Sequence, residues 1–151
     1  MRRCRPSKIW IDADSCPKAI KETVYKVAKR LNIPTNLVAN SYQNTPISEL
    51  IAMIVVDSGF DAADKYIIEH VEMHELVITA DIPLAAEVLK KKAVAVNPRG
   101  EVYDEENICS ILSMRDILKE FRDAGTITGG PPPFGPKDVQ QFANALHKLT
   151  L

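Results

Sequence analysis

The chain has few cysteines, and it lacks any long run of apolar residues. Cys4, Cys16 and Cys109 are widely spaced, so they form neither a zinc-binding spacing nor a disulfide framework. No stretch approaches the roughly 20 apolar residues of a membrane span. The basic N-terminus also lacks the apolar core of a signal peptide. We therefore expect a cytoplasmic protein with no membrane partner.

Neither an excess of positive charge nor a cluster of aromatic residues indicates a surface for nucleic acid. The net charge is −1, and residues 1–8 carry four of the cations, so the remainder stands at −5. Aromatic residues make up 6% of the chain and are scattered, so no stacking platform is visible. The length of 151 residues suits a single domain with its own core. We expect residues 8–151 to form that domain and residues 1–7 to be a disordered basic tail.

Short apolar segments alternate with segments of helical periodicity along the chain. The apolar segments are typical of strands and lie at 9–11, 37–39, 51–56, 76–79 and 93–96. The predicted helices lie at 17–31, 62–71, 83–89 and 105–124, with a final helix from 137. Strands separated by helices predict an α/β fold with a mostly parallel sheet of about five strands.

Aspartates follow several of the predicted strands. Asp12 and Asp14 end the first strand, Asp81 follows the strand at 76–79, and Asp64 opens the helix after the strand at 51–56. Ligands of open α/β sheets bind beyond the carboxyl ends of the strands, so these four carboxylates should meet at one edge. Side chains two residues apart on a strand lie roughly 7 Å apart on one face. Such carboxylates repel unless a cation sits between them. The residues therefore predict a site for Mg²⁺ or Mn²⁺.

Helix capping is the alternative explanation for each of these aspartates. Asp12 or Asp14 can cap the helix that begins near Pro17, and Asp81 can cap the helix that begins near Pro83. Asp61 and Asp64 have the three-residue spacing of a capping box. Both interpretations remain open from the residues alone.

Two other kinds of site are not supported. Cys16 stands at a helix start, where a thiol can become a nucleophile. The cysteine loop of a phosphatase would, however, need an arginine at position 22, which is Glu22. No histidine has a second ligand at metal-binding spacing.

The chain resembles the YaiI/YqxD family of bacterial proteins from about Lys8 to the C-terminus. The segments that carry the resemblance are 10–17, 37–40, 59–64, 76–85, 97–100, 114–116, 129–131 and 138–142. The family looks like a member of the PIN-like superfamily of metal-dependent nucleases. The resemblance therefore implies a three-layer α/β/α sandwich of PIN-like type.

The resemblance also implies roles for individual residues. In PIN-like enzymes an acid ends the first strand, another opens a middle helix, and a third stands in a Thr-x-Asp motif. These fall on Asp12 with Asp14, on Asp64, and on Thr79 with Asp81. The superfamily's further Glu in an earlier helix has no clear match, although Glu22 and Glu49 are candidates.

The sequence leads to three hypotheses. The first is a Mg²⁺- or Mn²⁺-dependent nuclease that acts on RNA. The second is a phosphatase of the haloacid-dehalogenase type with Asp12 as nucleophile, and the third is a nucleotide- or RNA-binding module without turnover. For the nuclease we expect Asp12, Asp14, Asp64 and Asp81 to bind metal and act in catalysis. The supporting residues are Thr79, Asp61 and Asn40 around the metal ligands, and Lys18, Lys65, Arg99 and Arg115 on the phosphate.

Overall fold

The structure is a computed structural model that describes residues 5–57, 59, 62–123 and 133–151; the side chains of 115 and 121–123 are outside this description. Within this range the chain forms one six-stranded sheet in the order β3-β2-β1-β4-β5-β6. The strands are β1 (Ile9–Asp12), β2 (Thr35–Ala39), β3 (Ile51–Val55), β4 (Leu76–Ile78), β5 (Val94–Val96) and β6 (Val102–Tyr103). All neighbours are parallel except β5 and β6, which are antiparallel.

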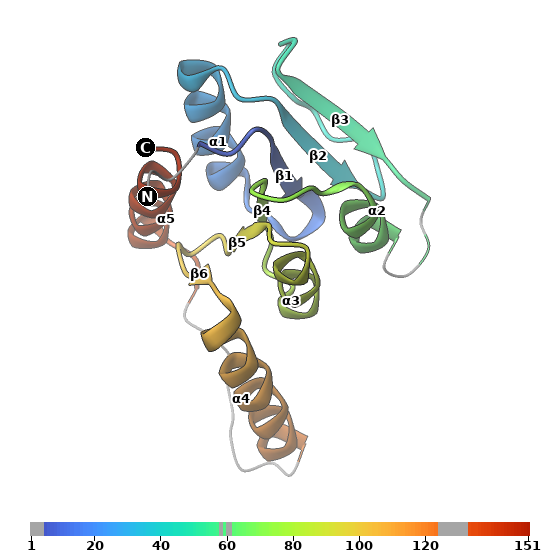
Figure 1. The fold of residues 1–151 in the computed structure, drawn as a ribbon, viewed down its shortest axis with the longest axis vertical. Helices are drawn as coiled ribbons and strands as arrows, with labels where there is room; N and C mark the ends of the chain where they lie inside the picture. The colour runs from blue at the N-terminus through green and yellow to red at the C-terminus, as the bar shows by residue number, and fades with distance from the viewer. Residues whose placement is uncertain (1–4, 58, 60–61, 124–132) are drawn as a thin grey trace.

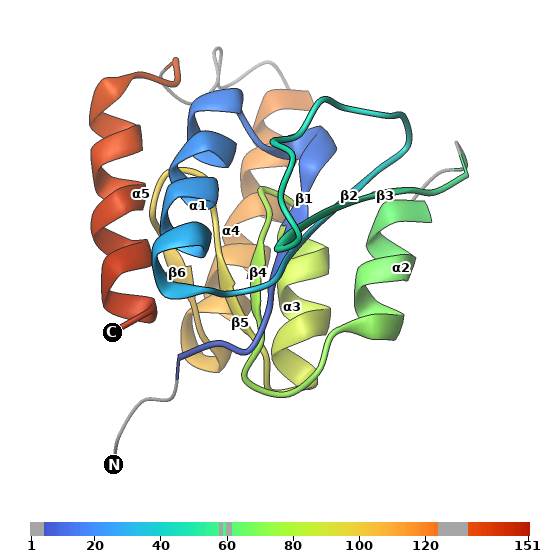
Figure 2. The ribbon, with the colours of Figure 1, turned by 90° about the horizontal axis from the view of Figure 1, so that it is seen from above.

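Helices cover both faces of this sheet (Figures 1 and 2). The helices are α1 (Lys18–Leu31), α2 (Ala62–His70), α3 (Ile82–Lys90), α4 (Glu105–Asp123) and α5 (Pro136–Leu149), with a 3-10 turn, η1 (Ala13–Ser15), after β1. Helices α1 and α5 lie side by side on one face, and α2 and α3 lie on the other. The distal part of α4 extends away from the body of the molecule.

Two hydrophobic clusters form the core because side chains alternate between the faces of a strand. On β1, Ile9 and Ile11 point towards α1 and α5, where they join Phe142. Trp10, between them, points the other way and joins the cluster of α2 and α3. Each face of the sheet therefore buries its own set of apolar side chains.

The topology defines one edge at which ligands are expected. From β1 the chain moves outward to β2 and β3, and it then returns to place β4 on the other side of β1. The carboxyl ends of β1 and β4 therefore adjoin where the strand order reverses, which is the usual ligand-binding position in doubly wound sheets. Asp12 ends β1, and Thr79 follows β4 directly.

The predicted α/β fold with a mostly parallel sheet is confirmed. The five predicted strands all form, although the second begins earlier, at Thr35, and each of the others differs by one residue at one end. The sheet gains β6, which the sequence analysis missed because its two residues are too few to show periodicity. Of the predicted tail, residues 1–4 lie outside the described residues.

A turn between β5 and β6 sets the position of α5. Asn97 accepts the backbone N–H groups of Arg99 and Glu101 through Oδ1, at 2.9 and 3.0 Å. Gly100 completes the turn with φ +91°, a backbone conformation that side chains disfavour. A Cβ atom there would lie 2.6 Å from the backbone of Gln141 in α5. The glycine therefore allows α5 to approach this turn closely.

Candidate functional site

A single buried carboxylate, Asp12, lies at the centre of the carboxyl edge. Asp12 as a whole is 5% exposed, and its position at the end of β1 places it beside β4. The Thr79 hydroxyl donates to Asp12 Oδ2 at 2.8 Å, and the Ser15 hydroxyl donates to the same oxygen at 2.9 Å. Burial of an ionised group without partners is costly, so these two donors stabilise the carboxylate.

Backbone N–H groups fix the direction of both hydroxyls. The N–H of Asp81 donates to Thr79 Oγ1 at 2.9 Å, and the N–H of Ala80 donates to Ser15 Oγ at 3.3 Å. Each hydroxyl then has its own proton free to point at Asp12. The loop after β4 and the turn after β1 are thereby joined through one oxygen, Oδ2. Among the described residues no group donates to Asp12 Oδ1.

The surroundings of Asp12 disfavour its charge. Burial raises the pKa of the Asp12 carboxyl above its ordinary value of 3.8, while the hydrogen bonds from Thr79 and Ser15 lower it. The negative charges of Asp81 and Asp14 raise the pKa further. Asp12 is therefore an acid whose ionised form would gain from a nearby cation.

Asp14 makes contacts that neither interpretation of the sequence predicted. Its Oδ2 accepts the backbone N–H of Asn40 at 2.9 Å, and its Oδ1 accepts the side-chain amide of Gln43 at 3.3 Å. Gln43 in turn accepts a hydrogen bond from the Lys21 ammonium through Oε1. The suggestion that Asp12 or Asp14 caps α1 is wrong, because the N-cap is Pro17 and no side chain caps that helix. Asp14 instead fixes the loop that follows β2.

Asp81 does cap a helix, as the capping alternative predicted. Its Oδ1 accepts the backbone N–H of Leu84 at 3.0 Å, and the helix that follows has proline in its first turn. This role occupies one carboxylate oxygen, and the charge of Asp81 still reaches Asp12. Capping and a place beside the buried carboxylate are therefore compatible.

The remaining predicted site residues are spread more widely. Asp64 is half-buried in the first turn of α2, which follows β3 at the same edge of the sheet, and Asp61 lies outside the described residues. Within the described ranges, no three His, Cys, Asp or Glu side chains converge closely enough to hold a metal ion. The structure thus brings Asp81 and Asp14 near Asp12, and it does not gather all four aspartates into one cage.

The predicted phosphate-binding cations differ in their exposure and in their contacts. Lys18 and Lys65 are exposed in the first turns of α1 and α2. Arg99 is partly buried and pairs with Asp138 of α5 at 3.3 Å, so it has a structural role at the start of that helix. Arg115 lies in α4, and its side chain is outside the described residues.

Sequence reasoning missed Ser15, whose hydroxyl links Asp12 to the backbone of the loop after β4. Its place directly after the Asp-x-Asp pair was the available signal. Cys16 is buried, and burial raises the pKa of its thiol to about 12. This value agrees with the sequence argument against a cysteine nucleophile, because the thiolate is scarce at neutral pH.

Comparison with known proteins places the chain in a family. The profile described as "Uncharacterized BCR, YaiI/YqxD family" matches residues 10–151, a range that includes every aspartate discussed above. The chain belongs to the YaiI/YqxD family. No solved structure matches it.

Its relatives in this family extend over nearly the whole chain. A UPF0178 protein of Maridesulfovibrio salexigens is 52% identical over 142 residues and is covered over 94% of both chains. A UPF0178 protein of Shewanella sp. MR-7 is 52% identical over 141 residues, with 93% of each chain covered. One from Geobacter metallireducens is 51% identical over 142 residues, or 94% of this chain and 92% of the relative. No helix in the described part of the chain is long and apolar enough to cross a membrane.

Proposed function

We propose that this protein is a Mg²⁺- or Mn²⁺-dependent nuclease that hydrolyses RNA at the carboxyl edge of its sheet. The observation that carries the proposal is the state of Asp12. It is buried at the point where the strand order reverses, its charge is disfavoured, and only one of its two oxygens is held by described residues. A cation beside Oδ1 would relieve both burial and repulsion.

The chemistry of the donors fits a hard divalent cation. Oxygen ligands are what Mg²⁺ and Mn²⁺ prefer, and Mg²⁺ often binds through one or two carboxylates together with water and substrate phosphates. Asp12 and Asp81 supply two such carboxylates, so three converging side chains are not required. Asp14 would join the site only if its side chain turned away from Asn40 and Gln43, and Asp64 would join it from the first turn of α2.

A bound divalent cation would activate a water molecule and stabilise the leaving oxygen of a phosphodiester. The side chains of the protein would orient the metal ligand and neutralise the phosphate charge. Thr79 and Ser15 hold Asp12 in one orientation through Oδ2, which would leave Oδ1 available to hold the cation. Lys18 and Lys65, in the first turns of α1 and α2, would neutralise phosphate charge.

We also propose that the fold is a three-layer α/β/α sandwich of PIN-like type. The two hydrophobic clusters, one on each face of the sheet, support a three-layer α/β/α sandwich. The strand order β3-β2-β1-β4-β5 and the acid at the end of β1 support membership of the PIN-like superfamily.

Two other functions would use the same edge. In a phosphatase, Asp12 Oδ1 would attack phosphorus and displace the alcohol of the phosphomonoester, and the second aspartate of the pair would give the leaving oxygen its proton. Asp14 is poorly suited to that step, because both of its oxygens accept hydrogen bonds from the loop after β2. A binding module without turnover would need the cation and the phosphate contacts but no activated water.

The test is a cleavage assay on labelled single-stranded RNA, with phosphomonoesters tested in parallel. We expect cleavage with Mg²⁺ or Mn²⁺, none in excess EDTA, and loss of activity in Asp12→Asn and Asp81→Asn. Asp104→Asn is the matched control, because Asp104 caps the first turn of α4 as Asp81 caps α3. Asn caps nearly as well as Asp, so neither capping variant should lose its helix.

Each alternative gives a different result. Equal cleavage in excess EDTA, or full activity in Asp12→Asn, would overturn the metal-dependent mechanism. Turnover of phosphomonoesters alone would favour the phosphatase. Binding of RNA without any turnover would favour the module.

A further inference from the structure

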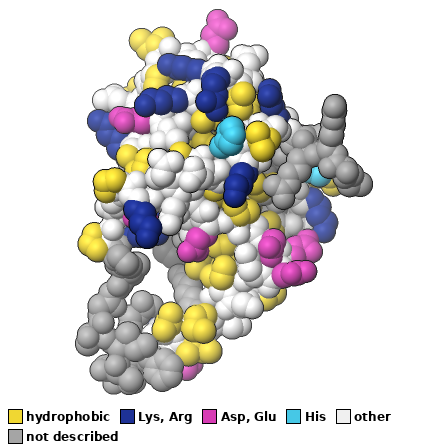
Figure 3. Space-filling model, turned by 90° about the vertical axis from the view of Figure 1, so that its left-hand side faces the viewer, with side chains coloured by type: hydrophobic (Ala, Val, Ile, Leu, Met, Phe, Trp, Pro, Cys, Tyr) yellow, Lys and Arg dark blue, Asp and Glu magenta, His cyan; other side chains and the backbone are white. Residues whose placement is uncertain are grey.

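The exposed sides of α1 and α5 form a surface rich in cations, although the whole chain is slightly acidic. Helix α1 carries five Lys or Arg residues and one acid, Glu22. Helix α5 adds two lysines and one acid, Asp138, which is half-buried against Arg99. Figure 3 views the side of the molecule on which α1 and α5 lie, and several Lys and Arg side chains are visible across its upper part. We call the exposed set the α1–α5 face: Lys18, Lys26, Lys29, Arg30, Lys137 and Lys148.

The cations of this face have no acidic partners among the described residues. The ion pairs of the described chain join Lys90 to Glu87, Lys92 to Glu105 and Arg99 to Asp138. None of the six residues of the α1–α5 face takes part in them. Glu22 lies one helical turn from both Lys18 and Lys26, yet it pairs with neither. Their positive charge is therefore directed to solvent.

Stabilisation of the helices explains only part of this arrangement. Lys29, Arg30 and Lys148 lie in last turns, where cations interact favourably with the helix dipole. Lys18 and Lys137 lie in first turns, where the same dipole opposes a cation. A local cost at two helix starts suggests that these charges serve something outside the helices.

The two helix starts lie at the edge of the sheet that holds Asp12. Helices α1 and α5 run side by side from that edge towards the opposite one, as Figures 1 and 2 show. Lys21, one turn after Lys18, connects through Gln43 to Asp14. The exposed cations of α1 are thus spread along about 21 Å, the length of a 14-residue helix, with Glu22 between Lys18 and Lys26, and the helix starts at the edge that holds the candidate site.

We propose that the α1–α5 face binds the phosphate backbone of single-stranded RNA and leads the strand towards Asp12. The inference rests on the proposed function for the identity of the polyanion, but its test requires no cleavage. Between the cations, α5 exposes Gln140, Gln141 and Asn144, which can donate hydrogen bonds to phosphate or ribose.

A membrane surface is the less suitable occupant. Helices that lie on lipid insert large apolar side chains on the same side as their cations. The large exposed apolar side chains of the described residues lie outside both α1 and α5. The α1–α5 face offers charge and amides without such anchors, which suits a phosphate backbone.

The experiment measures binding of a short labelled single-stranded RNA by fluorescence anisotropy, in EDTA, over a series of KCl concentrations. The test variant is the full chain with Lys26→Gln, Lys29→Gln and Arg30→Gln. We expect its log Kd to depend on log salt with a slope smaller by about 2 units, since each lost phosphate contact removes about 0.7. Such a change corresponds to about 100-fold weaker binding at 0.1 M salt.

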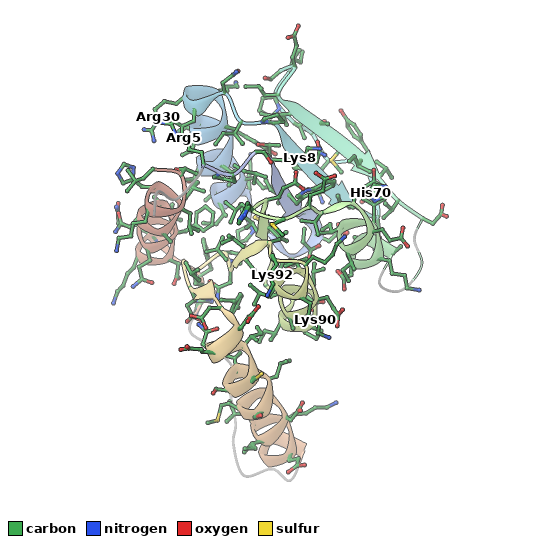
Figure 4. All side chains as sticks on the ribbon, in the orientation of Figure 1. Arg5, Lys8, Arg30, His70, Lys90 and Lys92 are labelled. Atoms are coloured by element: carbon green, nitrogen blue, oxygen red, sulfur yellow. The ribbon has the colours of Figure 1, made fainter. Side chains whose placement is uncertain are left out.

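The matched control removes three lysines from the last turn and end of α3, with Lys90→Gln, Lys91→Gln and Lys92→Gln. It has the same change in charge at a helix C-terminus, and it also removes the exposed ion pairs of Lys90 with Glu87 and of Lys92 with Glu105. Figure 4 shows Lys90 and Lys92 well away from Arg30. We expect the control to bind as the parent does. Equal weakening in both triple variants would overturn the inference, as would unchanged binding in the test variant.

A second variant guards against effects on folding. Lys18→Gln with Lys137→Gln removes cations that the helix dipoles disfavour, so its melting temperature should stay equal or rise while RNA binding weakens. Unchanged binding in this variant would overturn the part of the inference that leads the strand to the site.

The remaining outcomes separate this inference from the proposed function. RNA binding in EDTA, without cleavage under any metal, would leave the inference standing and refute the nuclease. Metal-dependent cleavage with the same KM in parent and test variant would support the nuclease and refute the binding role of the α1–α5 face. Association with phosphatidylserine vesicles in place of RNA would overturn the inference in favour of a membrane surface.

Discussion

Asp12→Asn should raise the melting temperature of the metal-free protein, although it removes a residue proposed to be essential for activity. Both hydroxyl donors reach the same oxygen, Oδ2, so the amide oxygen can take its place. The amide NH₂ would then stand where Oδ1 stands now, and no described group donates there. The substitution therefore removes the charge and preserves the hydrogen bonds.

The size of the effect follows from opposing contributions. A bond to a neutral acceptor is weaker than one to a carboxylate, so the two hydroxyl bonds together lose about 2 kcal/mol. Against this, keeping the buried Asp12 carboxylate ionised in the folded state costs roughly several kcal/mol. Repulsion from Asp81 and Asp14 adds to this cost. The raised pKa of Asp12 indicates that the penalty is the larger. A net gain of about 1 kcal/mol would raise the melting temperature of a chain this size by about 2–4 °C.

The pH dependence gives the reasoning a second check. Because the folded pKa of Asp12 is raised, protonation stabilises the folded parent, and this stability is lost as pH rises through that pKa. The difference between variant and parent should therefore be largest at neutral pH. It should vanish as pH falls towards the ordinary value of 3.8.

The assay is thermal unfolding in EDTA from neutral to acid pH, repeated with Mn²⁺. The parent should gain RT ln(1 + [L]/Kd) from the metal, whereas Asp12→Asn should gain almost nothing. The control is Asp104→Asn, which removes an aspartate charge at the start of α4, where Asp104 caps the helix. A lower melting temperature for Asp12→Asn in EDTA at neutral pH, or a difference independent of pH, would refute the argument.

Three further predictions follow from neighbouring contacts. Asp14→Asn should lower stability in EDTA by about 0.5–1.5 kcal/mol in urea unfolding, because one of its oxygens no longer accepts from Gln43 or Asn40; a gain in stability would show that repulsion dominates. Thr79→Ala should weaken Mn²⁺ binding measured by calorimetry by about 10–100-fold, whereas Thr79→Ser should retain it because the hydroxyl remains. Cys16 should resist a thiol reagent at pH 8 in the folded chain, since its pKa is about 12, and exposed Cys109 should react; prompt labelling of Cys16, located by peptide mapping, would contradict its burial.

The sequence was sufficient for the parts of the fold that depend on periodicity. Alternation of strands and helices predicted the parallel sheet, and the reasoning about strand ends placed Asp12 and Asp81 near one another. Proline at the start of α3 also indicated the capping role of Asp81. These features are local in the chain, or they follow from a general rule of α/β topology.

Contacts between loops could not be predicted in the same way. Asp14 binds a backbone N–H from the loop after β2, and no pattern of side chains reveals which N–H groups a loop leaves unpaired. The α1–α5 face was missed for a different reason. Net charge sums over the whole chain, whereas the face appears only when the outer sides of two helices, far apart in sequence, are considered together.

The turn at Gly100 limits which sequences can encode this arrangement. The fully buried Phe142 follows Gln141, whose backbone Gly100 contacts, so any side chain at position 100 would displace a residue of the core. Gly59 and Gly135 have open space around them and adopt no left-handed backbone, so there a side chain is sterically possible. In a library of random substitutions, position 100 would therefore behave like a core residue despite its place in a loop. The arrangement of two helices on the surface is encoded, in part, by the smallest side chain in a turn between two strands.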